Sequence, residues 1–235
     1  MNRFFNPDSP AMRFMSKMAD LMILNIAALL CCIPVITIGA SLTAMHYVLL
    51  KMVRNEEGYI LRSFFKSWKE NFKQATIIWL PILLFIIVFV GDLMIFKYSG
   101  IEFPQILKAL LLAAAVFVYM VSCYVFPILS RFHNTVRNTW KNALLMSICS
   151  FPRTVAMMVL YVLPFAACLN MMTIPLVFFF GLSLPAYASA ILYDGIFRKY
   201  APEEEPLADS FELTAEDTGA GEIVRSRDEA RKNKG

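Results

Sequence analysis

Long apolar stretches, separated by short basic segments, dominate the pattern of hydrophobic and polar positions along the chain. Because the hydrocarbon core of a bilayer is about 30 Å thick, a helix needs about 20 apolar residues to cross it. Four stretches reach or nearly reach this length, at 75–96, 106–130, 154–172 and 174–196. The last two are separated only by a tight turn and therefore predict a helical hairpin. The pattern predicts an all-α, polytopic transmembrane bundle.

A fifth apolar stretch, 21–50, is too long for a single span. As one helix it would be about 45 Å long at about 1.5 Å per residue. It also carries Pro34 and Gly39 near its middle, and these residues interrupt helices. We therefore expect two helices, 12–33 and 40–54, joined by a turn. Because broken backbone must be shielded from lipid, this turn should be buried in protein or lie at the outer face.

The distribution of Lys and Arg predicts the orientation of the helices, because short cytoplasmic loops are enriched in these residues. Segment 51–73 holds six of them and segment 131–153 holds four, whereas 97–108 holds two and 172–175 holds none. The two rich segments, and with them the C-terminus, are therefore expected in the cytoplasm. A broken first stretch gives six helices and a cytoplasmic N-terminus, while an unbroken one gives five helices and an external N-terminus.

Composition supports the membrane assignment and divides the chain in two. Hydrophobic residues make up 58% of the chain and charged residues only 17%, against roughly 45–50% and about 25% in soluble domains. Residues 1–200 hold 17 Lys and Arg against 8 Asp and Glu, whereas residues 201–235 hold 5 against 10. We therefore expect a basic membrane domain over 1–200 and a disordered cytoplasmic tail over 201–235.

The segment 61–73 has the pattern of an amphipathic cytoplasmic loop helix. At helical spacing, one side carries Leu61, Phe64, Phe65, Trp68 and Phe72, and the other carries Arg62, Lys66, Lys69, Glu70 and Lys73. Such a helix can lie in the interface against anionic lipid headgroups. The alternative to this simpler interpretation is a docking surface for a cytoplasmic partner such as a transporter ATPase. Basic residues interleaved with aromatic ones at a membrane face favour lipid over nucleic acid.

Polar residues inside apolar stretches are candidates for substrate binding, because burying them in lipid is unfavourable. Asn25, Thr37 and Ser41 lie near the expected break of the first stretch, and discontinuous helices bind solutes in transporters. Asp92 lies toward the external end of its helix, where it is either solvated or in contact with a cation or a sugar hydroxyl. The chain shows no matching break in a second half and no internal repeat that would support transport.

Other polar residues predict packing rather than chemistry. Asp194 has Arg198 four residues later, which suggests an ion pair on one helix face. His46 is either a donor in helix packing or a ligand, with packing the simpler interpretation. The five cysteines show no metal-ligand spacing, and no phosphate-binding or nucleophile motif is present. We therefore expect no metal, no cofactor and no catalytic activity.

An ordered series of residues occupies the first third of the chain: Asp20-Leu21, Leu24-Asn25, Cys31-Cys32-Ile33-Pro34-Val35-Ile36-Thr37-Ile38-Gly39-Ala40-Ser41, Leu50-Lys51-Met52-Val53-Arg54-Asn55-Glu56-Glu57-Gly58-Tyr59-Ile60 and Ser63-Phe64-Phe65-Lys66-Ser67-Trp68-Lys69-Glu70-Asn71-Phe72-Lys73-Gln74-Ala75-Thr76. This series resembles the YesL-like family of bacterial multi-pass membrane proteins, a family of uncharacterised function. The resemblance is dense over 4–80 and looser to about 200.

The resemblance implies a place in the plasma membrane of a bacterium, most often a Gram-positive one, and an association with carbohydrate importers and sugar-degrading enzymes. It supplies no catalytic residues. Together with the residue pattern, it predicts an accessory or interaction protein linked to carbohydrate uptake or its regulation, acting through 51–73. The alternative is a transport component that binds a solute at the broken first segment.

Overall fold

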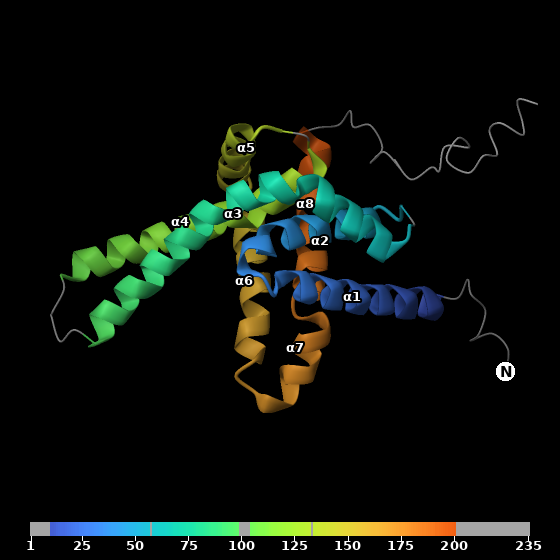
Figure 1. Ribbon diagram of the computed structural model, residues 1–235, viewed down its shortest axis with the longest axis horizontal. Coiled ribbons are helices and arrows are strands. Elements are labelled where there is room, and N and C mark those ends of the chain that lie inside the picture. Colours follow the sequence, from blue (N-terminus) through green and yellow to red (C-terminus); the bar gives the residue numbers. More distant parts are fainter. Residues whose placement is uncertain (1–9, 57, 99–103, 133, 201–235) are drawn as a thin grey trace, which may run out of the picture. The chain divides into compact units, whose positions relative to one another are not determined.

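The computed structural model describes residues 10–56, 58–98, 104–132 and 134–200, with only the backbone described at 10, 11 and 198–200 (Figure 1). The tail predicted at 201–235 lies outside these ranges. All regular elements in the described ranges are helices, which confirms the all-α prediction. In chain order they are α1 (Pro10–Cys32), η1 (Val35–Thr37), α2 (Ile38–Val53), α3 (Ile60–Tyr98), α4 (Gln105–Arg131), α5 (Val136–Cys149), α6 (Phe151–Ala167), η2 (Met171–Thr173), α7 (Ile174–Phe180) and α8 (Ser183–Tyr200).

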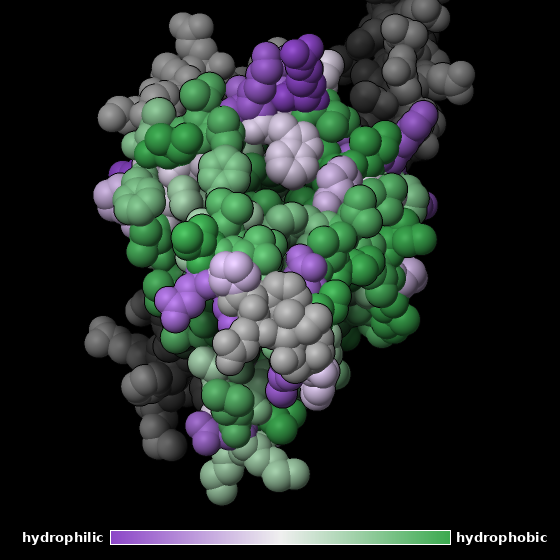
Figure 2. Space-filling view, turned by 90° about the vertical axis from the view of Figure 1, so that its left-hand side faces the viewer, coloured by the Kyte–Doolittle hydropathy of each residue, from purple (hydrophilic) through white to green (hydrophobic). Residues whose placement is uncertain are grey.

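Four helical segments are long and apolar enough to cross a bilayer: Met12–Cys32, Val35–Val53, Ile60–Tyr98 and Gln105–Arg131. Two bent helix pairs, α5 with α6 and α7 with α8, bring the number to as many as six. Figure 2 shows that hydrophobic residues cover most of one face, with the largest group of hydrophilic residues at its upper edge and smaller ones elsewhere on it. The large apolar side chains exposed on α3 and α4 include Leu84, Ile87, Leu110 and Leu112. This is the surface of a multi-pass membrane protein.

The first apolar stretch is broken where Pro34 predicts it. The hydroxyl of Thr37 donates hydrogen bonds to the carbonyl oxygens of Cys31 (2.6 Å) and Pro34 (2.7 Å). The indole N–H of Trp79 on α3 donates to the carbonyl of Val35 at 2.8 Å. Protein groups therefore satisfy the carbonyls that the break leaves unpaired, as the membrane interior requires.

Helix α2 is the central helix of the described bundle, and it contacts α1, α3 and α4. Within its apolar window 61% of residues are buried, against 17% in α3. Gly39 permits the close approach of α3, because a Cβ atom there would lie 2.7 Å from the Cβ of Trp79 and 2.8 Å from the carbonyl oxygen of Ala75. The same glycine that helps to predict the break is thus also needed for packing.

Helix α3 joins two segments that the sequence pattern separates. The amphipathic segment is helical as predicted, but it continues directly into the membrane-spanning stretch as one helix of 39 residues. At about 1.5 Å per residue this helix is about 58 Å long, nearly twice the thickness of the hydrocarbon core. Neither Gly nor Pro occurs between Ile60 and Leu80, so nothing in the local sequence ends the helix at the membrane surface.

The C-terminal half departs from the hydropathy pattern in two further places. Residues 136–149, expected as part of a basic loop, form α5, whose N-terminus is capped by the hydroxyl of Thr135 accepting from the backbone N–H of Asn138. Helix α5 then meets α6 at an angle of 102°. The predicted span 174–196 is bent by 55° between α7 and α8, at Gly181.

Candidate functional site

Three helix ends meet at a buried cluster of charged side chains. The Oδ1 atom of Asp194 on α8 lies 2.9 Å from Arg54 Nε, at the end of α2, and 3.4 Å from Arg131 Nη1, at the end of α4. All three side chains are at most 12% exposed. The Arg131 guanidinium also lies over the ring of Phe197, 5.2 Å from its centroid. This charged cluster ties α2, α4 and α8 together at one end of the bundle.

The cluster gives Asp194 two partners that the sequence did not suggest. The carboxylate pairs across the fold with residues 140 and 63 positions away in the chain, while the side chain of Arg198 is outside the described part. Breaking a buried ion pair costs about 3–5 kcal/mol, because one charge is left buried without its partner, whereas an exposed i,i+4 pair contributes only about 0.3–0.5 kcal/mol. The sequence signal that could have found it is the presence of charged residues at the ends of three apolar stretches.

The N-terminal half of α1 lies at this same end of α2. The ammonium of Lys17 donates to Oδ1 of Asn55 at 3.1 Å, and Asn55 directly follows α2 in the left-handed region at φ 54°. Asparagine is one of the few residues that adopt this conformation readily. Helices α1 and α2 therefore run antiparallel as a hairpin, which is the arrangement behind the six-helix prediction.

His46 belongs to a buried polar group deeper in the bundle. Its Nδ1 atom lies 3.2 Å from the hydroxyl of Tyr193, and its Nε2 atom lies 3.5 Å from the hydroxyl of Tyr161. The Tyr161 hydroxyl in turn lies 2.7 Å from that of Ser189. These contacts join α2, α6 and α8, as expected of a histidine used in helix packing. In the described ranges no three His, Cys, Asp or Glu side chains gather in a way that could hold a metal ion.

The three polar residues of the first stretch that were considered for substrate binding are all bonded to backbone groups. Asn25 donates to the carbonyl of Phe178 at 2.7 Å, and its Oδ1 accepts from the N–H groups of Leu182 and Ser183, each at 2.9 Å. The hydroxyl of Ser41 donates to the carbonyl of Ala28 at 2.9 Å. Together with the Thr37 bonds at η1, these contacts satisfy backbone groups at the two helix breaks and between α1 and α2.

Asp92 is not part of this arrangement. It lies on α3, 13 residues beyond Trp79, so about 20 Å of helix separates it from the broken segment. The structure therefore brings Asn25, Thr37 and Ser41 to the α1–α2 hairpin but leaves Asp92 apart from them.

The first turns of α3, residues 60–73, form what we call the α3 basic segment. Its apolar side is divided: Phe64 is fully buried and Ser67 nearly so, whereas Leu61 and Phe65 are 46% and 45% exposed. Trp68 and Phe72 are partly buried and pack edge to face, with ring centroids 4.9 Å apart.

The charged side of the α3 basic segment faces outward. Arg62, Lys69 and Lys73 are exposed, and Lys66 lies 3.9 Å from Glu70 in an i,i+4 pair. Exposed aromatic and apolar groups stand among these cations, since Tyr59, just before the helix, is 81% exposed. The sequence pattern found these residues but assigned their whole apolar side to one surface. The structure shows that part of that side packs on the protein itself.

Comparison with known proteins finds a family model that is similar to a part of the N-terminal half of the chain. No curated protein and no solved structure shows a significant match. Residues 21–93 match the model of a family described as "Protein of unknown function, DUF624". The match covers the second half of α1, all of α2 and most of α3, and so includes the α1–α2 break, Arg54 and the α3 basic segment.

Proposed function

We propose that this chain is an accessory membrane protein that binds a protein partner through the α3 basic segment. The observation that carries the proposal is the continuity of α3, a helix of 39 residues from Ile60 to Tyr98. This continuous helix presents exposed basic and aromatic groups in its first turns and packs on α2 and η1 through Ala75 and Trp79. Its second half, after Pro81, is apolar and largely exposed. Such a helix can couple a bound partner to the membrane hairpin.

Burial within the segment supports docking over simple attachment to lipid. Phe64 is fully buried, so the protein core, rather than the bilayer, fixes the orientation of these turns. Among the exposed groups that remain, Tyr59, Phe65 and Arg62 are of types that are enriched in protein interfaces. The surrounding lysines favour a partner with an acidic surface.

The class of partner and the location follow from the resemblance and from the charge pattern. We infer that the chain resides in a bacterial plasma membrane with the Lys- and Arg-rich ends and the C-terminus in the cytoplasm. The partner we favour is the ATPase or permease of a carbohydrate importer, and the role is accessory or regulatory. No residue set in the described ranges suggests catalysis.

The test is purification of the tagged full-length chain from native membranes with quantification of the proteins that accompany it. The triple variant Lys66→Glu, Lys69→Glu, Lys73→Glu should reduce an importer subunit by at least tenfold. The matched control, Lys97→Glu with Lys108→Glu, reverses lysines at the other end of the α3–α4 hairpin and should retain it. An unchanged set of partners in the triple variant contradicts the proposal.

Solute binding at the α1–α2 break is the alternative function, and the contacts of its candidate residues count against it. Asn25, Thr37 and Ser41 direct their polar atoms to backbone groups. Thermal unfolding in the presence of a panel of sugars distinguishes the two proposals. A solute-dependent rise in melting temperature that Ser41→Ala abolishes would favour transport instead.

A further inference from the structure

Exposed cations of α3 and α5 gather at the end of the bundle where α8 also ends. Two lie on each helix, and together we call them the α3–α5 basic surface: Lys69, Lys73, Arg137 and Lys141. The side-chain amide of Gln74 donates to the carbonyl oxygen of Asn134. Because Gln74 follows Lys73 directly and Asn134 precedes Arg137 by three residues, this bond holds the two parts of the surface side by side.

The last turns of α8 contact the connection that leads into this surface. The ring of Phe197 packs edge to face on that of Phe132, with the ring centroids 5.5 Å apart. Figure 1 shows α8 ending beside the connection from α4 to α5. Phe132 is only two residues from Asn134. The chain beyond α8 therefore continues from a point next to the α3–α5 basic surface.

The sequence that follows α8 has the opposite charge. Residues 203–217, which we call the acidic stretch and which lie outside the described ranges, hold seven Asp and Glu and no Lys or Arg. The stretch also holds the large apolar residues Leu207, Phe211 and Leu213. Apolar surface for them exists on α3, where Phe65 is 45% exposed one turn before the basic surface begins. Stretch and surface thus match in both charge and apolar content.

The acidic stretch is close enough and long enough to lie along the surface. Its first residue, Glu203, follows Phe197 by only six residues. Fifteen extended residues span up to about 50 Å, whereas the α3 basic segment is about 20 Å long at about 1.5 Å per residue. Attachment through a short link also raises an effective concentration to the order of millimolar. Individually weak surface ion pairs therefore suffice to hold the stretch in place.

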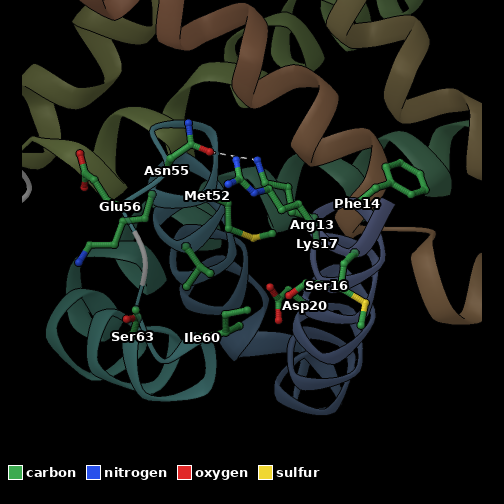
Figure 3. A pocket seen from close by; sticks show the side chains of 14 residues that line it. Arg13, Phe14, Ser16, Lys17, Asp20, Met52, Asn55, Glu56, Ile60 and Ser63 are labelled. Carbon is green, nitrogen blue, oxygen red and sulfur yellow. Dashed lines mark hydrogen bonds between the residues drawn. The ribbon is translucent and has the colours of Figure 1, made fainter. Parts of the chain in front are cut away.

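A second group of cations at this end of α2 is less suited to the acidic stretch. It lines a cavity of about 1030 Å³ between α1, the end of α2 and the start of α3 (Figure 3). The carboxylates of Asp20 and Glu56 line this cavity together with Arg13 and Lys17. Figure 3 also shows Lys17 bonded to Asn55, at 3.1 Å. The cavity supplies its own carboxylates, so the α3–α5 surface is the better match for an acidic segment.

We propose that the acidic stretch binds the α3–α5 basic surface of the same chain, and that it thereby competes with the acidic surface of a protein partner for Lys69 and Lys73. Salt screens exposed ion pairs, so the bound stretch is released as ionic strength rises and is displaced by a partner with a larger interface. The competition, though not the docking itself, rests on the proposed function.

The first experiment measures docking without any partner. Spin labels are attached at Asn138→Cys, an exposed position on the first turn of α5, and at Ser210→Cys in the acidic stretch. The chain is full length, purified, and has its five native cysteines replaced by alanine. Double electron–electron resonance at low salt should show a narrow population of short distances, which high salt reduces.

Charge variants identify the groups that hold the stretch. Neutralising its first four carboxylates, by Glu203→Gln, Glu204→Gln, Glu205→Gln and Asp209→Asn, should reduce the narrow population at least threefold. Lys69→Gln with Lys73→Gln should do the same. The matched control, Lys97→Gln with Lys108→Gln at the other end of the α3–α4 hairpin, should leave it unchanged.

Two outcomes of the first experiment overturn the docking. One is a distance distribution in the chain with its native charges that is as broad as in the chain with a neutralised stretch. The other is a short distance between singly labelled chains mixed in equal amounts, because the stretch would then bind a neighbouring copy.

The second experiment measures competition, by the purification from native membranes that tests the proposed function. The full-length chain with the neutralised acidic stretch should retain at least threefold more of the importer subunit than the unmodified chain. Docking with unchanged retention of the partner refutes the competition. If no variant retains an importer subunit, the proposed function and the competition both fail, while the docking is decided by the spin-label distances alone.

Discussion

At each helix break of this bundle, a polar side chain forms hydrogen bonds with backbone groups that lack a partner within their helix. Asn25 does so with residues more than 150 positions away in the chain. One amide bridges the end of α7 and the start of α8, with bonds to Phe178, Leu182 and Ser183. Buried N–H and C=O groups that lose their partners destabilise a fold by about 1–3 kcal/mol. The kink at Gly181 is therefore stable only while α1 supplies this side chain.

We expect Asn25→Ala to lower the free energy of unfolding by about 1–3 kcal/mol, because it removes the partner of one buried and two partly buried backbone groups. Thermal unfolding in detergent, followed by circular dichroism, measures the effect. Ser122→Ala is the control, since the Ser122 hydroxyl bonds only to the Val118 carbonyl one turn before it in the same helix. Equal melting temperatures for the two variants would refute the bridging role of Asn25.

The charged cluster gives a second prediction at the residue scale. Asp194→Asn retains the size of the side chain but removes the charge that faces Arg54 and Arg131. Breaking a buried ion pair costs about 3–5 kcal/mol, so we expect a marked loss of stability in the same assay. Glu70→Gln, which removes a partly exposed partner of Lys66, should cost at most about 1 kcal/mol. A loss for Asp194→Asn no larger than that of the control would contradict the cluster's role.

At the scale of helices, the packing of α2 on α3 depends on Gly39, and Gly91 on α3 provides a matched control. Gly39→Ala would place a Cβ atom 2.7 Å from Trp79 and 2.8 Å from the backbone of Ala75, whereas Gly91→Ala meets nothing within 4 Å. Overpacking costs about 1–3 kcal/mol, while an unhindered Gly-to-Ala change in a helix gains up to about 1 kcal/mol. We therefore expect shifts in melting temperature of opposite sign. A shift of the same sign in both variants would disprove the close contact.

The helices also show which features local sequence can predict. Pro34 acts on its own neighbours, and so the α1–α2 break could be predicted. The bend at Gly181 depends on Asn25, more than 150 residues away in the chain, and no local pattern reports such a partner. The hydropathy pattern likewise separated 61–73 from 75–96, because the first segment is rich in charged residues and the second is apolar. The backbone nevertheless continues as one helix across this change in composition.

In the candidate site, too, some features are set by local sequence and others by residues that are distant in the chain. The alternation of aromatic and basic residues in the α3 basic segment is local and was visible in the sequence. Which of those aromatic residues remain exposed depends on the position of α2, so the burial of Phe64 and the exposure of Phe65 could not be read from it.

At the scale of the whole molecule, the six-helix prediction assigns the helix ends to two sides of the membrane, which labelling can test. The α2–α3 connection, the charged cluster and the N-terminal half of α1 share one side. The α6–α7 turn follows α6 away from it and holds Cys168, an exposed cysteine. If the basic side is cytoplasmic, a membrane-impermeant maleimide should label Cys168 in intact cells when the other four cysteines are replaced by alanine.

The matching variant carries Tyr59→Cys as its single cysteine, at a position 81% exposed on the α2–α3 connection. It should be labelled only after the membrane is permeabilised, because six crossings place this connection opposite Cys168. Labelling of both positions from outside would refute the arrangement of helix ends, and labelling of Tyr59→Cys alone would invert the orientation. Inversion would place the α3 basic segment outside the cell, where no cytoplasmic ATPase could reach it, and would thereby also remove the partner that we propose.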